Sequence, residues 1–161
     1  QRIKNERCRF MKPIDDEKIK ATNVELEKRF KDERNQWVED IKKLVKSSSD
    51  TSKLNEAQVY QLSYRQMCVE KISEYSILLE KRQELFDKQC ASRFREYTTN
   101  YDLKLSGSEK QLFIQSDCSE LKLQIKMISV QIKFFEESIK TLDNLGFAIR
   151  NKIEIVSKQL I

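Results

Sequence analysis

The side chains that most often carry acid–base chemistry are present in this chain, but their spacing does not assemble a site. Adjacent carboxylates occur at Asp15-Asp16, Glu39-Asp40 and Glu136-Glu137. Two carboxylates can divide the general-acid and general-base roles of an enzyme, but these pairs lie in charge-balanced segments with helical periodicity. A solvated helix face therefore explains them better than catalysis does.

Metal and nucleophile chemistry has equally little support. The four cysteines, Cys8, Cys68, Cys90 and Cys118, lack the CxxC spacing of zinc sites, and the 161 residues include no histidine. Zinc fingers and mechanisms that need an imidazole are therefore excluded. There is no P-loop, no glycine-rich phosphate cradle and no nucleophile elbow. We expect a protein that is not an enzyme, with no metal and no cofactor. Because no signal peptide is apparent, we expect free, mostly buried thiols in a reducing cytoplasm.

Basic side chains between residues 81 and 95 have a spacing that suits a polyanion. This segment carries five Lys or Arg residues against two acidic ones. Because successive helical residues turn by about 100°, Lys81, Lys88 and Arg95 line one side of a helix. Arg82 and Arg93 lie at the edge of the neighbouring apolar stripe, where their stems can pack and their charged ends can reach solvent.

These basic residues, named here the cationic ridge, suit a phosphate backbone, and an aromatic ring beside them could stack on a base. Such binding would tolerate any sequence and would weaken with salt. An ordinary solvated helix face, with Glu84 and Asp87 pairing locally, remains open from composition alone. The candidate DNA-binding residues are Lys81, Arg82, Lys88, Arg93, Arg95 and Tyr97.

Composition indicates that long helices position these residues. The chain has two Gly and one Pro, with 35 % charged and 39 % apolar residues, a profile typical of long helices or coiled coil. Residues 1–13 read as a basic N-terminal arm that ends at Pro13, which suits a helix start. Apolar steps of three, four and seven predict one helix over about 14–46 and a second over about 54–101. We group residues 14–106 as two long antiparallel helices that carry the ridge.

Residues 107–161 are predicted to form a loop and a C-terminal oligomerisation helix. Residues 105–108 read as a turn, and 112–114 as an irregular or short extended segment. Asp117, with a glutamate three residues later, marks the next helix start. Over residues 121–160, apolar side chains alternate steps of four and three, which is the 3.5-residue repeat of a coiled-coil seam.

A seam of this length predicts packing against other helices, either within the chain or between copies of it. Lys126, Lys133 and Lys140 repeat every seven residues beside the seam and suit its solvent-exposed flank. Gly146 lies on the seam, where it allows close backbone approach or marks a bend. The residues predicted to form the oligomer interface are Ile125, Ile128, Ile132, Phe135, Ile139, Leu142, Gly146, Ile149 and Ile153. The expected fold class is all-α, with three long amphipathic helices assembled into a homo-oligomer.

A co-linear set of short segments adds to this pattern. The first two segments are Trp37-Val38-Glu39-Asp40 and Asp50-Thr51-Ser52-Lys53-Leu54. They are followed along the chain by Glu74-Tyr75-Ser76-Ile77-Leu78-Leu79 and Arg93-Phe94-Arg95-Glu96-Tyr97. The last segment, near the end of the chain, is Gly146-Phe147-Ala148-Ile149-Arg150. In this order the segments resemble the UvsY-like recombination mediators of tailed phages. The resemblance covers about three-quarters of the chain, from about residue 32 to about residue 154.

The resemblance implies a small ring-forming homo-oligomer without an active site. Members of this family bind single-stranded DNA, a single-strand-binding protein and a RecA-like recombinase, and they help to exchange one protein for the other on the strand. It also implies a cytoplasmic protein, in the infected host cell if the chain is phage-encoded.

Two other functions remain open from the sequence. A structural coiled-coil or scaffold protein would use its charges only for solubility and register, and it would not bind nucleic acid. A membrane-surface helical module would need large apolar side chains exposed beside the ridge, whereas narrow stripes suit helix packing. No apolar run approaches the roughly 20 residues that cross a bilayer, so we expect no membrane partner.

Overall fold

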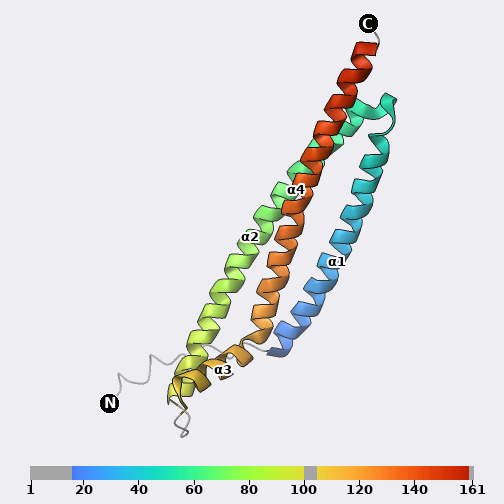
Figure 1. Ribbon diagram of the computed structural model, residues 1–161. Coiled ribbons are helices and arrows are strands. Elements are labelled where there is room, and N and C mark those ends of the chain that lie inside the picture. Colours follow the sequence, from blue (N-terminus) through green and yellow to red (C-terminus); the bar gives the residue numbers. More distant parts are fainter. Residues whose placement is uncertain (1–15, 100–104, 160–161) are drawn as a thin grey trace, which may run out of the picture.

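The computed structural model describes residues 16–99 and 105–159, and these residues are almost entirely helical (Figure 1). The elements are α1 (Asp16–Ser47), the short 3-10 helix η1 (Thr51–Lys53), α2 (Leu54–Thr99), α3 (Gly107–Asp117) and α4 (Ser119–Gln159). No strand occurs within these two ranges, so the predicted all-α fold class is confirmed. The basic arm of residues 1–13 lies outside the described residues.

The three long helices run side by side as an elongated bundle, with α2 antiparallel to α1 and α4 (Figure 1). Parallel α1 and α4 keep a nearly constant register, because their hydrogen-bonded pairs lie 97 to 104 residues apart in the chain. The α2–α4 contact is the most extensive one, and α1 packs more lightly on both. The short α3 lies at the end of the bundle where α2 stops and α4 starts (Figure 1).

Aromatic rings from all three long helices meet in the core. The Tyr75 ring of α2 stacks on Phe135 of α4 with 6.2 Å between ring centroids, and meets Phe30 of α1 edge-on at 5.3 Å. Trp37 of α1 contacts Phe135 edge-on at 5.7 Å. Such ring pairs stabilise a fold by about 0.5–1.5 kcal/mol each, beyond the apolar area that they bury. The cluster therefore fixes how the helices approach one another at mid-bundle.

The predicted coiled-coil seam of α4 is largely filled by the chain itself. Ile128, Phe135, Leu142, Gly146 and Ile149 are buried in the core that α1 and α2 form with α4. Their assignment to an oligomer interface is corrected here to the core of a single chain, because the repeat requires partner helices without specifying whose they are. The half-buried members of the predicted interface are Ile125, Ile132, Ile139 and Ile153. Assembly into a homo-oligomer stays a prediction.

The segment predicted as a turn followed by irregular or extended chain is instead the helix α3. Its N-cap is Ser106, whose hydroxyl accepts a hydrogen bond from the Glu109 backbone N–H at 3.3 Å. The Glu109 carboxylate in turn accepts hydrogen bonds from the Ser106 backbone N–H and from the Ser106 hydroxyl, both at 2.8 Å, and these two bonds lower the pKa of Glu109. This capping box satisfies two backbone donors at the helix start. Cys118 then separates the two helices, so α4 begins at Ser119 and not at Asp117.

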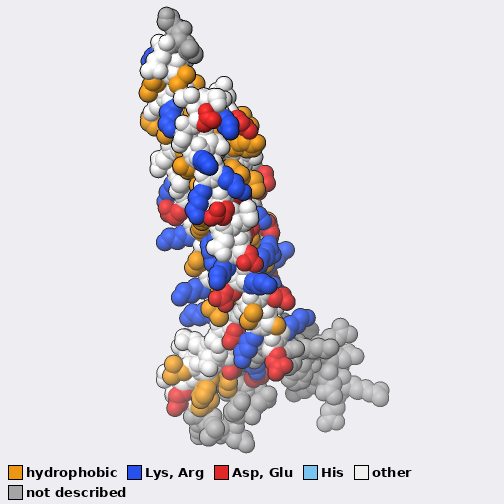
Figure 2. Space-filling view, turned by 90° about the vertical axis from the view of Figure 1, so that its right-hand side faces the viewer, with side chains coloured by type: hydrophobic (Ala, Val, Ile, Leu, Met, Phe, Trp, Pro, Cys, Tyr) orange, Lys and Arg blue, Asp and Glu red, His pale blue; other side chains and the backbone are white. Residues whose placement is uncertain are grey.

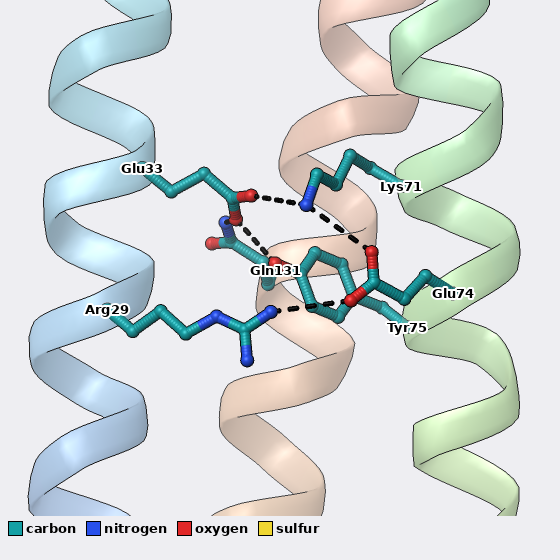
Figure 3. A network of polar contacts seen from close by, with 6 residues as sticks. All are labelled: Arg29, Glu33, Lys71, Glu74, Tyr75 and Gln131. Carbon is teal, nitrogen blue, oxygen red and sulfur yellow. Dashed lines mark hydrogen bonds and ion pairs between the residues drawn. The ribbon is translucent and has the colours of Figure 1, made fainter.

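A polar network crosses the core close to the aromatic rings (Figure 3). One carboxylate oxygen of Glu33 accepts hydrogen bonds from the Tyr75 hydroxyl at 2.6 Å and from Gln131 Nε2 at 2.7 Å. Its other oxygen lies 3.2 Å from Lys71 Nζ, which also pairs with Glu74 at 3.3 Å. Because the donors come from α2 and α4 while Glu33 belongs to α1, this one carboxylate connects all three long helices.

Gly146 allows the close approach that the seam predicted, and α4 continues through it to Gln159. A Cβ atom at this position would lie 2.7 Å from Nε2 of Gln61 on α2. The Gln61 amide is buried and donates a hydrogen bond to the Leu142 carbonyl at 2.8 Å. The missing side chain of Gly146 therefore makes room for a buried polar contact between α2 and α4.

Gly146→Ala should destabilise the fold although alanine favours helix by about 1 kcal/mol. The new methyl group displaces Gln61 and leaves a buried amide without a partner, at a cost of about 1–3 kcal/mol. In a Gln61→Ala background the same change meets no obstacle and should stabilise the protein by up to about 1 kcal/mol. Urea unfolding of the four proteins measures both effects, and an equal loss in the two backgrounds would contradict this account of Gly146.

The stability of the bundle should fall with pH above about 10, partly because of Tyr75. Burial, then the hydrogen bond to Glu33 and the charge of that residue, raise the pKa of Tyr75. The folded protein keeps the phenolic proton at pH values where the unfolded chain has lost it. The free energy of unfolding therefore decreases with rising pH, by up to about 1.4 kcal/mol per pH unit from this group.

Tyr75→Phe removes the phenolic hydroxyl, and with it the contribution of this group to the pH dependence of the free energy of unfolding. The difference in free energy of unfolding between the wild type and the variant should shrink from about pH 9 to about pH 11, measured by urea unfolding. The other tyrosines are present in both proteins, so their contributions to the pH dependence cancel in the difference. A difference that does not change with pH would mean that Tyr75 ionises alike in the folded and unfolded states.

Candidate nucleic-acid interface

Three members of the cationic ridge form an exposed row along α2. Lys81, Lys88 and Arg95 all have exposed side chains, and the helical rise places successive members about 10 Å apart. Lys88 is paired with Glu84 one turn earlier, on a part of the surface where water and salt screen the attraction. Within the described residues neither Lys81 nor Arg95 makes an ion pair. These three residues are named here the exposed row.

The other predicted contact residues are turned into the structure. Arg82 is half-buried, and its Nε atom is buried without a hydrogen-bond partner among the described residues. Arg93 pairs with Glu96 at 2.9 Å, and its Nε atom lies 3.7 Å from Asp117. The structure therefore does not bring all six predicted residues onto one surface.

Tyr97 is also engaged within the chain, so its predicted role as a stacking surface needs correction. Its hydroxyl donates a hydrogen bond to Asp117 at 2.7 Å. Its ring stacks on Phe113 of α3, with 5.8 Å between the ring centroids. Asp117 and Phe113 thus hold the end of α2 against α3, a contact that sequence reasoning missed. The capping box of Ser106 and Glu109 was the signal that could have revealed α3.

The aromatic ring available beside the exposed row is Phe94. Its side chain is 54 % exposed. It neighbours Arg95 in the chain and projects from the adjacent position of the helix. An exposed aromatic ring next to a cation is the pairing that proteins use to stack on unpaired bases. Phe94 is therefore a candidate contact residue that the sequence prediction of the site did not include.

Charges of both signs share one side of the bundle. Figure 2 shows the side of the molecule that faces right in Figure 1, where Lys and Arg side chains are interleaved with Asp and Glu. On α4, Lys122, Lys126 and Lys133 are exposed, and the sequence has no acidic residue between Leu121 and Phe135. On the side that Figure 2 shows, the mixed pattern leaves no uninterrupted cationic face for a polyanion.

The thiols fall into two environments. Cys68 is fully buried, and burial raises its pKa to about 12. Cys118 is also buried, and its Sγ atom lies 3.3 Å from that of half-buried Cys90. Burial, followed by the hydrogen bond from Cys90, raises the pKa of Cys118 to about 12. The expectation of buried thiols is confirmed for Cys68 and Cys118, while Cys8 lies outside the described residues.

In the described ranges, 16–99 and 105–159, no three His, Cys, Asp or Glu side chains are grouped in a way that could hold a metal ion. In the same part of the chain no helix has the length and apolar character needed to cross a membrane. Comparison with models of protein families, with curated proteins and with solved structures found no match to this chain.

The contact between α2 and α3 should depend on Phe113. Replacing it with alanine removes the ring stacked on Tyr97, a loss of about 1 kcal/mol. Hydrogen exchange of amides in residues 107–117 should then become about fivefold faster, because α3 opens more often. Leu112→Ala is the matched control, since Leu112 is 67 % exposed and should leave the exchange rates unchanged. Equal rates in both variants would show that Phe113 does not hold α3.

Proposed function

We propose that this chain binds single-stranded DNA along the outward edge of α2 and acts as a recombination mediator. The observation that carries the proposal is the exposed row, in which Lys81, Lys88 and Arg95 project from one edge of a single continuous helix. Lys and Arg side chains attract a phosphate backbone whatever its sequence. Because a long helix is stiff, the three side chains leave the backbone at a fixed spacing, and only the side chains themselves become ordered on binding.

The exposed Phe94 adds a reason to favour single strands over duplex. Unpaired bases offer their faces to an aromatic side chain, and each stacked base contributes about 1–3 kcal/mol in single-strand-binding proteins. In a duplex those faces are already stacked on each other. The combination of Phe94 and Arg95 at neighbouring positions therefore suits a flexible single strand.

The mediator role rests on the segments that resemble the UvsY-like family, from Trp37 to the Gly146-Phe147-Ala148-Ile149-Arg150 run. In this proposal the protein binds strands coated by a single-strand-binding protein and helps to load a RecA-like recombinase onto them in the cytoplasm. A homo-oligomer would multiply the exposed row. Several weak rows on one assembly bind a strand far more tightly than one row does, because each later contact is intramolecular.

The binding of a fluorescent single-stranded oligonucleotide across a salt series tests the proposal. Lys81→Ala/Lys88→Ala/Arg95→Ala should bind more weakly, and its slope of log affinity against log salt should fall by about 2, since each phosphate contact contributes about 0.7. Lys42→Ala/Lys43→Ala/Lys46→Ala is the matched control, because it removes three exposed lysines near the other end of the bundle. The control should keep the wild-type slope.

Each alternative function predicts a different result in this assay. A wild-type protein that does not bind the strand at low salt would be a structural coiled-coil or scaffold protein. An equal loss of slope in both triple variants would mean that net charge, and not the exposed row, determines binding. Phe94→Ala should weaken binding without changing the salt slope, because stacking releases no counterions.

A further inference from the structure

Two cysteines from different elements meet at the junction of α2, α3 and α4. Cys90 belongs to α2, and Cys118 is the residue that separates α3 from α4. The Cys90 thiol donates a hydrogen bond to the Cys118 sulfur, with 3.3 Å between the two Sγ atoms. A disulfide bond is about 2.05 Å long, so the sulfurs need to approach by little more than 1 Å.

The two thiols differ in access, which sets the order in which they can react. Cys90 is half-buried and can be reached by a small oxidant, whereas Cys118 is 1 % exposed. Burial and the hydrogen bond from Cys90 raise the pKa of Cys118 to about 12. The nucleophile in thiol oxidation is the thiolate, so Cys118 reacts slowly with an oxidant in solution. Its fixed position beside Cys90 favours it as the second, resolving thiol.

We propose that Cys90 and Cys118 form a reversible intramolecular disulfide when the protein meets a peroxide. The Cys90 thiolate attacks an oxygen of hydrogen peroxide, so that an S–O bond forms, the O–O bond breaks, and the released hydroxide takes up a proton to become water. The Cys118 sulfur then attacks the Cys90 sulfur and breaks the S–O bond, and the hydroxyl leaves as water with the Cys118 proton. Two thiols are oxidised and one peroxide is reduced to two waters.

The disulfide would fasten the end of α2 to the junction of α3 and α4. It joins residues that lie 28 positions apart in the chain, and closing a loop of that size reduces the entropy of the unfolded state. For a protein of this length, the melting temperature should rise by about 10 °C. Dithiothreitol should reverse the shift.

Oxidation should also affect the cationic ridge, and this consequence rests on the proposed DNA binding. Asp117 directly precedes Cys118 and contacts both Arg93 Nε and the Tyr97 hydroxyl. A disulfide at Cys118 keeps Asp117 against α2, so that the Arg93 charge stays neutralised. In the reduced protein the junction can open and move the Asp117 carboxylate away from Arg93, whose ion pair with Glu96 within α2 is unaffected. The oxidised form should therefore bind single strands more weakly, because the Asp117 carboxylate stays beside the ridge and repels phosphate.

The disulfide is tested on the full-length protein treated with hydrogen peroxide, blocked with iodoacetamide and digested with trypsin without reduction. Mass spectrometry should find the peptide of residues 89–93 linked to that of residues 111–122. Cys90→Ser should abolish both this species and the rise in melting temperature. Cys68→Ser is the matched control and should retain both, because Cys68 is fully buried elsewhere in the core.

Other outcomes separate the parts of the proposal. A Cys90 that stays reduced, is oxidised to sulfinic acid, or links only to Cys8 would overturn the disulfide. Equal strand binding by the oxidised and reduced forms would overturn the consequence for DNA while the disulfide stands. Failure of the reduced protein to bind the strand would overturn the proposed function and leave the disulfide, measured without DNA, unaffected.

Discussion

The arrangement of the three long helices depends on one carboxylate inside the bundle. Glu33 of α1 is met by donors from Tyr75 and Lys71 on α2 and from Gln131 on α4. An apolar seam alone tolerates a slip by one heptad, because each repeat resembles the next. A slipped bundle would separate the Glu33 carboxylate from these donors and lose their hydrogen bonds. The network therefore specifies register, while the aromatic rings around it supply much of the apolar contact.

Register in turn decides what α2 presents to solvent. Its side chains at Cys68, Tyr75 and Gln89 face the other helices and are buried. Lys81, Lys88 and Arg95, from the second half of the helix, are left on its outer edge. Near the end of the helix, α3 takes up Arg93 and Tyr97 through Asp117. The packing of α2 against the other helices thus decides which basic residues of the ridge face solvent and which face the protein.

The parts of this fold that follow simple periodicity could be predicted from the sequence. The long helices and the seam of α4 are examples, because Leu121, Ile128 and Phe135 are large, apolar and evenly spaced. The full set of α2 residues that face the core was harder to predict. It includes Gln61 and Gln89, which are buried polar side chains that no hydrophobic pattern marks. Whether the seam pairs within or between chains is also undetermined by a repeat alone.

The contact between Gly146 and Gln61 has a consequence for how relatives of this chain could be found. A glycine on α4 and a long amide on α2 fit only as a matched pair, because a Cβ atom at position 146 would overlap the Gln61 side chain. Enlarging the first residue alone moves the Gln61 amide and costs stability, and a smaller second residue removes that cost. Overall sequence similarity between helical proteins fades quickly, since many side chains can serve in a charged helix face. A correlated change at two such distant positions would outlast it and would mark common descent.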